Sequence, residues 1–157
     1  MIFGIGTDIV EIDRIKEAVE KWGDRFLHRL YTEKELSYCY HKRDPFPSLA
    51  GKFAAKEAAI KAILRVKHQV SETENIAADE KTQIRDMLIA LPLPYKTISL
   101  REIEILNDDF GMPYIMIHNQ LFKPEINAFI HLTISHDRSN AIATVIVELK
   151  NSSKFGQ

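Results

Sequence analysis

The sequence predicts an α+β fold in which an antiparallel sheet packs against helices. Helical periodicity dominates the first half of the chain, whereas the second half alternates with the period of two that is typical of hairpin strands. The length of 157 residues is that of one domain, and the sequence contains neither an internal repeat nor a linker. We therefore expect a single domain over residues 1–150 and a loose tail at 151–157.

Composition argues against several classes of protein. Apolar residue types make up 45% of the chain and charged types 27%, which excludes a disordered protein. No apolar run approaches the roughly 18 residues that cross a bilayer, and no basic leader is visible, so we expect no membrane partner and no signal peptide. The lone cysteine, Cys39, cannot form an intrachain disulfide, which favours a cytoplasmic protein.

The first half is predicted to begin with a strand and to continue with helices. Residues 2–12 alternate like a strand. A helix from Arg14, capped by Asp13, is expected to reach about Leu30, with Gly23 as a candidate point of division.

Two further helices follow in this half of the chain. Thr32 and Glu35 have the form of a capping box for a short helix that ends near Tyr40. The two prolines in residues 44–47 predict an extended break, after which a helix is expected over residues 49–67.

The second half is predicted to form two hairpins. Residues 98–106 and 114–117 read as antiparallel strands joined by a turn at 107–111. A second pair of strands is expected at 130–135 and 141–149.

Two carboxylates stand where the periodicity calls for an apolar residue. Glu57 lies between Phe53 and Ile60 in the apolar stripe of its helix, and Asp8 lies inside the apolar run of the first strand. A desolvated carboxylate is costly unless a cation or several donors accompany it. If the two meet, their oxygens suit Mg²⁺, which completes its shell with water and substrate phosphates. The alternative is that Glu57 pairs with a lysine and Asp8 caps a backbone turn.

Lys61 and His136 are the candidate phosphate ligands. Lys61 lies four residues after Glu57, so it fits either a surface ion pair with Glu57 or a point charge for a phosphate beside it. His136 ends a strand at a turn, where an imidazole suits phosphate contact or proton transfer but also suits an ordinary polar position. The alanines that flank Glu57 would let a backbone or ligand approach closely, and they are also good helix formers.

The charge is distributed unevenly along the chain. Residues 14–67 contain 13 Lys and Arg against 7 Asp and Glu, whereas the remainder contains 8 against 15. Such a basic region suits an acidic protein or a polyphosphate, or it is simply an uneven solvated surface. Since no RNA-binding signature is present, we do not expect a nucleic-acid partner.

Taken together, three segments resemble the holo-acyl-carrier-protein synthases, the small bacterial 4'-phosphopantetheinyl transferases. They are residues 4–11 (GIGTDIVE), 53–58 (FAAKEA) with Lys61, and 134–136 (ISH). The hairpin around 102–113 is a weaker match. The chain departs from the family where a short glycine-containing loop is usual, because about residues 66–97 form an extra segment. We interpret this segment as a helical insertion, with a helix at 79–91, that acts as a lid or a subunit contact.

The resemblance implies a 4'-phosphopantetheinyl transferase-like fold and a defined reaction. Enzymes of this family transfer 4'-phosphopantetheine from coenzyme A to a serine of apo acyl carrier protein and release 3',5'-ADP, in the service of fatty acid and lipid biosynthesis. By resemblance, Asp8 and Glu57 would hold Mg²⁺, and Lys61 would bind the pyrophosphate of coenzyme A. Glu57, directly or through a metal-bound water, is the candidate to accept the serine proton, and by resemblance His136 would contact the adenosine 3'-phosphate.

The resemblance also implies partners. Family members dock acidic acyl carrier proteins on the helix that follows the first motif, and the smaller members are homotrimers with active sites at subunit junctions. The corresponding side chains here are four cations and an aromatic anchor, which could equally be a core residue: Arg14, Lys21, Arg25, Arg29 and Phe26. Two other functions stay open: a binding module that holds coenzyme A or a carrier protein without chemistry, and a phosphate-ester hydrolase that uses the same two carboxylates.

Overall fold

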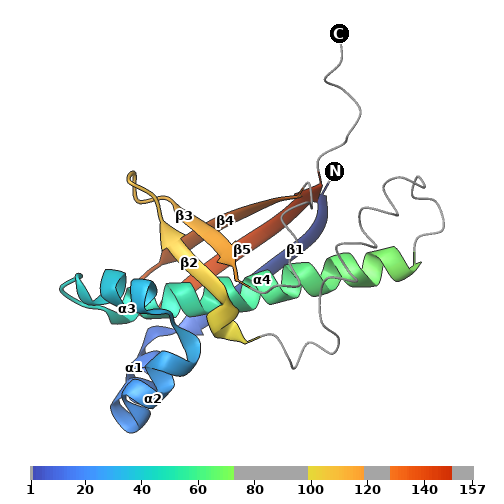
Figure 1. Ribbon diagram of the computed structural model, residues 1–157. Helices are drawn as coiled ribbons and strands as arrows, with labels where there is room; N and C mark the ends of the chain where they lie inside the picture. Colours follow the sequence, from blue (N-terminus) through green and yellow to red (C-terminus); the bar gives the residue numbers. More distant parts are fainter. Residues whose placement is uncertain (1, 73–98, 119–127, 150–157) are drawn as a thin grey trace.

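The computed structural model describes residues 2–72, 99–118 and 128–149 (Figure 1). Its elements, in chain order, are β1 (Ile2–Glu11), α1 (Ile12–Trp22), α2 (Asp24–Leu30), α3 (Glu33–Tyr40), α4 (Phe46–Glu72), the 3₁₀ turn η2 (Leu100–Glu102), β2 (Ile103–Asn107), β3 (Pro113–Ile117), β4 (Ala128–His136) and β5 (Asn140–Leu149). The predicted α+β class is confirmed. The expected helix at 79–91, the insertion beyond Glu72 and the tail at 151–157 lie outside the described residues.

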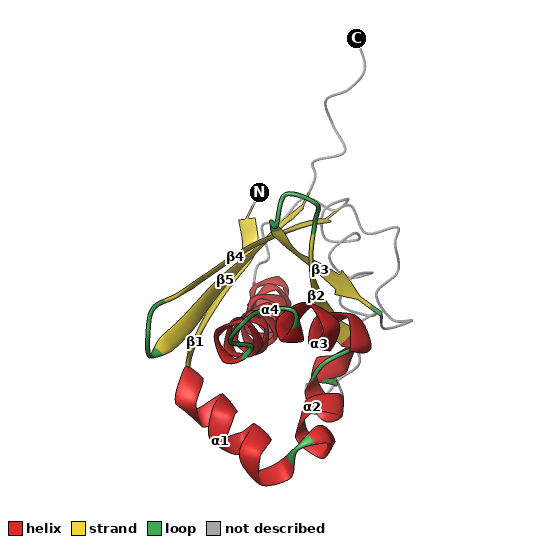
Figure 2. Ribbon diagram, turned by 90° about the vertical axis from the view of Figure 1, so that its left-hand side faces the viewer, coloured by secondary structure: helices red, strands yellow, loops and turns green. Residues whose placement is uncertain are grey.

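The long helix α4 lies between two antiparallel sheets. One sheet has the strand order β1-β5-β4, and the other is the hairpin β2-β3. Figure 2 shows α4 end-on, with the three-stranded sheet on one side and the hairpin on the other. The predicted antiparallel strands are therefore divided between two sheets, and each sheet buries one face against the same helix. Among the described residues, no helix has the length and hydropathy to cross a membrane.

The strand β1 packs directly on the backbone of α4 through Gly6. A Cβ atom added at Gly6 would lie 2.1 Å from the carbonyl oxygen of Ala58 and 2.6 Å from the amide nitrogen of Ala62. Both alanines are fully buried, as are Ala54 and Ala55. The small residues of α4 do allow a second backbone to approach closely, and any side chain at Gly6 would force the strand away from the helix.

Two helices begin earlier than predicted. α1 begins at Ile12, whose amide donates to the carbonyl of Ser139, so Asp13 lies in the first turn and is not the N-cap. α4 begins at Phe46, and Pro47 therefore lies in its first turn. The amides in the first turn of a helix have no intrahelical acceptor. Proline, which has no amide N–H, therefore loses no hydrogen bond at this position and is tolerated there.

Other predicted boundaries agree with the structure, with two exceptions. The helix α4 continues to Glu72, past its expected end at Lys67. Gly23, with φ of 52°, separates α1 from α2, and the capping box of Thr32 and Glu35 is present. The strand expected at 98–106 is wrong in its first part, which is the 3₁₀ turn η2. The hydroxyl of Ser99 accepts a hydrogen bond at the start of that turn, and this local cap competes with strand pairing.

Candidate active site

Asp8 and Glu57 line the same cavity, of about 560 Å³, between β1, α1 and α4. Asp8 projects from the face of β1 that contains Gly6, so the contact of Gly6 with α4 also brings Asp8 to the helix. Glu57 comes from α4 and is partly buried. The rest of the cavity wall combines three charged residues of α1 with apolar residues of α1 and its neighbours: Arg14, Glu17, Lys21, Ile9, Val10, Ile15, Ala18, Trp22, Phe26 and Phe53.

Lys61 forms its ion pair across the two elements. Its Nζ lies 2.7 Å from Oδ1 of Asp8 and donates a second hydrogen bond of 3.0 Å to the carbonyl of Thr7. The Asp8 side chain is 18% exposed, whereas that of Lys61 is half-exposed. The interaction is therefore screened and adds little stability, but it ties the strand to the helix at the cavity. The alternative in which Asp8 caps a turn is not the arrangement observed.

The electrostatics of Glu57 reflect the presence of a second acid. Burial raises the pKa of the Glu57 carboxyl, the negative charge of Asp8 raises it further, and the nearby Lys61 lowers it. A divalent cation would relieve the repulsion that Asp8 exerts on Glu57. The donor set therefore fits a hard cation that prefers oxygen ligands.

The carboxylates would provide only part of a coordination shell. Within residues 2–72, 99–118 and 128–149, no group of three or more His, Cys, Asp or Glu side chains is placed to hold a metal ion. Mg²⁺ commonly binds to one or two carboxylates and takes its remaining ligands from water and substrate phosphates. Two carboxylates at an open cavity are consistent with Mg²⁺ bound in this way.

His136 lies in a different cavity from Asp8 and Glu57. This second cavity, of about 170 Å³, is formed by α3, the start of α4, the turn between β2 and β3, and the end of β4. Its wall includes Lys52, Asn107 and Gly111 beside the exposed imidazole of His136. Within one copy of the chain, the structure thus does not bring His136 together with the two acids.

Sequence reasoning missed Lys52, which is buried in the wall of the second cavity. Its Nζ donates to the carbonyl of Ile105 and to Oδ1 of Asn107, and it lies 4.6 Å from the centre of the Tyr38 ring. The available signal was its spacing, because Lys52 precedes Lys56 by one helical turn on a face otherwise rich in buried alanine.

The residues predicted to bind a carrier protein lie around α1 and α2. Arg14, Lys21 and Phe26 line the first cavity, whereas Arg25 and Arg29 line an adjoining one of about 450 Å³ that also includes Phe26, Trp22 and Leu30. Phe26 is partly buried and packs against the core.

Trp22 is a further residue that sequence reasoning missed. It is 53% exposed, its ring stacks on Phe26 at 6.2 Å, and Nζ of Lys21 lies 4.9 Å from its centre. The available signal was that the one tryptophan of the chain lies next to Lys21.

An α+β chain with two carboxylates in one cavity, and a lysine paired to one of them, has features that are typical of phosphoryl-transfer enzymes. The 4'-phosphopantetheinyl transferase superfamily matches residues 4–145. Similar proteins identify the family within this superfamily. A holo-[acyl-carrier-protein] synthase of Halothermothrix orenii is 38% identical over 151 residues, which cover 94% of this chain and 98% of the relative. One of Chlamydia muridarum is 38% identical over 153 residues, with 98% and 100% covered. The chain belongs to the holo-[acyl-carrier-protein] synthase family.

Solved structures support this assignment. A holo-(acyl-carrier-protein) synthase of Bacillus anthracis, in complex with CoA (3',5'-ADP), superimposes with a TM-score of 0.62 at 29% identity and covers 96% of this chain and 99% of its own. The corresponding synthase of Helicobacter pylori, in complex with coenzyme A, has a TM-score of 0.64 at 29% identity, with 92% and 99% covered.

Replacing Asp8 with Asn should lower the pKa of Glu57. The substitution keeps the size of the side chain and removes a negative charge that raises this pKa, while the cation of Lys61 remains nearby. The measurement is an NMR titration of the Glu57 carboxyl carbon in the metal-free protein. Glu17→Gln, which alters another acid of the cavity wall, serves as the control and should leave the pKa in place. An unchanged pKa in Asp8→Asn would contradict the shared site.

Proposed function

We propose that this protein transfers 4'-phosphopantetheine from coenzyme A to a serine of an apo acyl carrier protein, which yields the holo-carrier and 3',5'-ADP. The observation that carries the proposal is the meeting of Asp8 and Glu57 at one cavity, with Lys61 paired to Asp8, in a chain of the holo-[acyl-carrier-protein] synthase family. Relatives of known structure bind coenzyme A, the donor in this reaction.

Asp8 and Glu57 would hold Mg²⁺ in this reaction. Their oxygens are the ligands that the ion prefers. The negative charge of Asp8 raises the pKa of Glu57, and a bound cation would offset this repulsion between the two carboxylates. When bound, Mg²⁺ would supply positive charge that stabilises the phosphates in the transition state. The ammonium of Lys61, already anchored at Asp8 and half-exposed, would bind the pyrophosphate as a point charge.

The chemistry requires one bond to form and one to break. The serine oxygen forms a bond to the phosphorus that carries pantetheine, the pyrophosphate P–O bond breaks, and 3',5'-ADP leaves. The serine proton needs an acceptor near the first cavity. Glu57 is our candidate, directly or through a water, because its carboxylate lines this cavity beside Asp8.

His136 would bind the adenosine 3'-phosphate in the second cavity, where the buried ammonium of Lys52 adds positive charge.

Since the two cavities are separate in one chain, we propose a homotrimer in which neighbouring copies complete each site. The outer face of the three-stranded sheet supports association. Its apolar side chains are 41–64% exposed and lie on three adjoining strands: Ile5, Ile9, Phe129 and Ile142.

The surface around α1 and α2 would dock the carrier protein. Arg25 and Arg29 offer positive charge beside the exposed ring of Trp22, and Arg14 and Lys21 continue this charge to the cavity that contains Glu57. Acyl carrier proteins are acidic, so the charges are complementary. Charge at such a rim mostly sets the association rate and its salt dependence.

We also place the reaction in the cytoplasm. Cys39 is a buried free thiol, and burial raises its pKa to about 12, so it stays protonated and unreactive. A free cysteine is typical of proteins that work in a reducing compartment.

Incubation with coenzyme A, Mg²⁺ and an apo acyl carrier protein should add one phosphopantetheine mass to the carrier. Glu57→Gln and Asp8→Asn should each slow the transfer by about 100-fold or more, because each removes a ligand of the cation that would stabilise the reacting phosphates. Mass spectrometry of the carrier gives the rate, and Glu17→Gln is the control. Saturable coenzyme A binding without mass transfer would favour the binding module, and ADP release without a carrier would favour the hydrolase.

The protein should sediment at three times the mass of one chain. Ile5→Lys places a charge on the outer face of the sheet and should shift the sedimentation equilibrium towards monomers, with loss of transfer activity. Phe110→Lys, at the 93% exposed tip of the β2-β3 hairpin, is the control for adding a lysine to an exposed apolar position. A monomeric wild-type protein with full activity would contradict the trimer.

Reversing the charge of Arg25 and Arg29 to Glu should raise KM for the carrier protein by about tenfold at low salt. The difference from wild type should shrink near 1 M salt, where the Debye length is only about 3 Å. Arg65→Glu, on the exposed side of α4, controls for the reversal of an arginine charge outside this surface. Equal KM values for the double variant and wild type at low salt would exclude this docking surface.

A further inference from the structure

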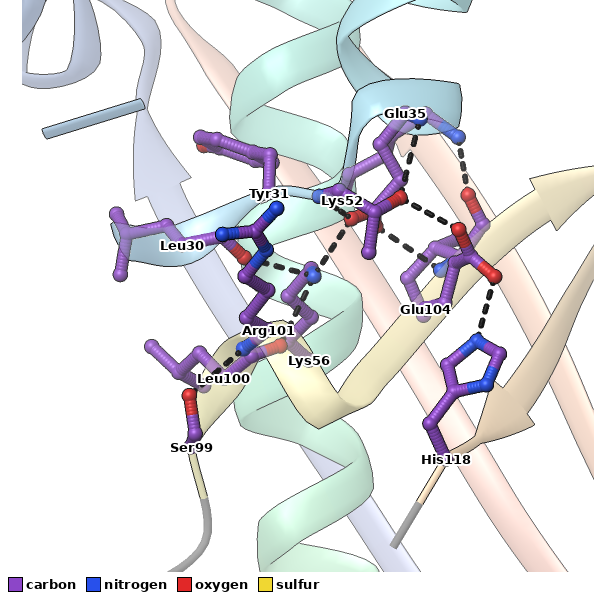
Figure 3. A network of polar contacts seen from close by, with 12 residues as sticks. Leu30, Tyr31, Glu35, Lys52, Lys56, Ser99, Leu100, Arg101, Glu104 and His118 are labelled. Atoms are coloured by element: carbon purple, nitrogen blue, oxygen red, sulfur yellow. Dashed lines mark hydrogen bonds and ion pairs between the residues drawn. The ribbon is translucent and has the colours of Figure 1, made fainter. Parts of the chain in front are cut away.

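Glu35 of α3 and Lys56 of α4 form a buried ion pair outside both cavities (Figure 3). The Nζ of Lys56 lies 2.8 Å from Oε2 of Glu35, and both side chains are 0% exposed. The same ammonium donates to the carbonyls of Leu30, at 2.8 Å, and Leu100, at 2.9 Å, so all three of its protons are used. Buried pairs are often no more stabilising than an apolar substitute, so stability alone does not account for this one.

The carboxylate of Glu35 extends the connection to β2. Its Oε1 accepts the amide of Ile105 at 2.9 Å, and its Oε2 also accepts the amide of Thr32 at 2.8 Å. The carbonyl of Ile105 accepts in turn from Lys52. Both backbone groups of Ile105 are thus bound by side chains from α3 and α4, as a neighbouring strand would bind them. The hairpin is not part of the larger sheet, and these bonds hold it against the helices.

The strand that Glu35 holds ends at the second cavity. Two residues after Ile105, Oδ1 of Asn107 accepts from Lys52 at 3.2 Å and its Nδ2 donates to the carbonyl of Gly111 at 3.0 Å. Lys52, Asn107 and Gly111 all line this cavity beside His136. A shift of β2 relative to α4 would therefore change the wall of the cavity, although Glu35 itself does not line it.

We propose that Glu35 is a positioning residue for coenzyme A. It holds β2 against α4 so that Asn107, Lys52 and the β2-β3 turn form the cavity beside His136. This inference rests on the proposed function, in which that cavity takes the adenosine end of coenzyme A. Glu35 touches no ligand in this arrangement and acts through Ile105.

A positioning role and a purely structural role predict different kinetics. If Glu35 only stabilises the fold, its variants lower the unfolding temperature, and the molecules that remain folded bind as before. If Glu35 positions the cavity, folded variants bind 3',5'-ADP more weakly and raise KM for coenzyme A, while kcat changes little because Asp8 and Glu57 lie in the other cavity.

The variants are Glu35→Met, which removes both carboxylate oxygens at similar size and so leaves the Ile105 amide without its acceptor, and the double variant Glu35→Met with Lys56→Met, which leaves no unpaired buried charge. Glu33→Met is the matched control, because Glu33 lies on the same helix with its side chain 72% exposed. For each protein, calorimetry gives Kd for 3',5'-ADP below the unfolding temperature, and the carrier assay gives KM and kcat.

We expect Kd and KM to rise at least about tenfold in both Glu35 variants, with kcat within about threefold of wild type. The double variant should regain stability relative to the single variant without regaining affinity. Wild-type Kd and KM in a folded Glu35 variant would overturn the proposal. If wild type itself neither binds 3',5'-ADP nor transfers the group, the proposed function fails instead.

If neither variant folds, amide hydrogen exchange in the wild-type protein decides. The proposal requires the Ile105 amide to exchange only through global unfolding. Binding of 3',5'-ADP should then slow this exchange by the factor that corresponds to its stabilisation of the whole protein. Fast exchange at Ile105, before or after binding, would overturn the proposal.

Discussion

The contact of Gly6 in β1 with Ala58 in α4 is the constraint on which the site depends. With no side chain between them, the strand and the helix meet at backbone distance. Asp8 lies two residues further along the same face of the strand, so it arrives beside the turn of α4 that contains Glu57 and Lys61. The acids therefore share a cavity although they are far apart in the sequence. Their proximity follows from the absence of a side chain at Gly6.

Adjacent residues of α4 serve different parts of the molecule. Lys56 is fully buried and pairs with Glu35, which connects the helix to the hairpin, whereas Glu57 lines the cavity with Asp8. Because successive residues on a helix point about 100° apart, one short motif can reach both sides of the element. The helix therefore links the two cavities: one turn earlier, Lys52 lines the cavity of His136.

Much of the fold could be predicted from local patterns, and the long-range contacts could not. The class, the strand at the start and the capping box of Thr32 and Glu35 follow from periodicity and cap chemistry. The interruption of apolar stripes singled out Asp8 and Glu57, whose roles as metal ligands stay predictions. The spacing of four residues made an ion pair between Lys61 and Glu57 one of the predicted alternatives. In the structure Lys61 pairs with Asp8, because β1 approaches α4 closely. In the same way, nothing near Glu35 in the sequence indicates its bond to Ile105 or its pair with Lys56.

The proposed reaction depends on Asp8 and Glu57 sharing one divalent cation. Its most direct test is a crystal grown with coenzyme A and Mn²⁺, which prefers the same oxygen ligands as Mg²⁺ and can be located by its anomalous scattering. We predict one strong anomalous peak in contact with a carboxylate oxygen of each acid and with the pyrophosphate. A peak bound elsewhere, or an ordered pyrophosphate that contacts neither carboxylate, would contradict the account.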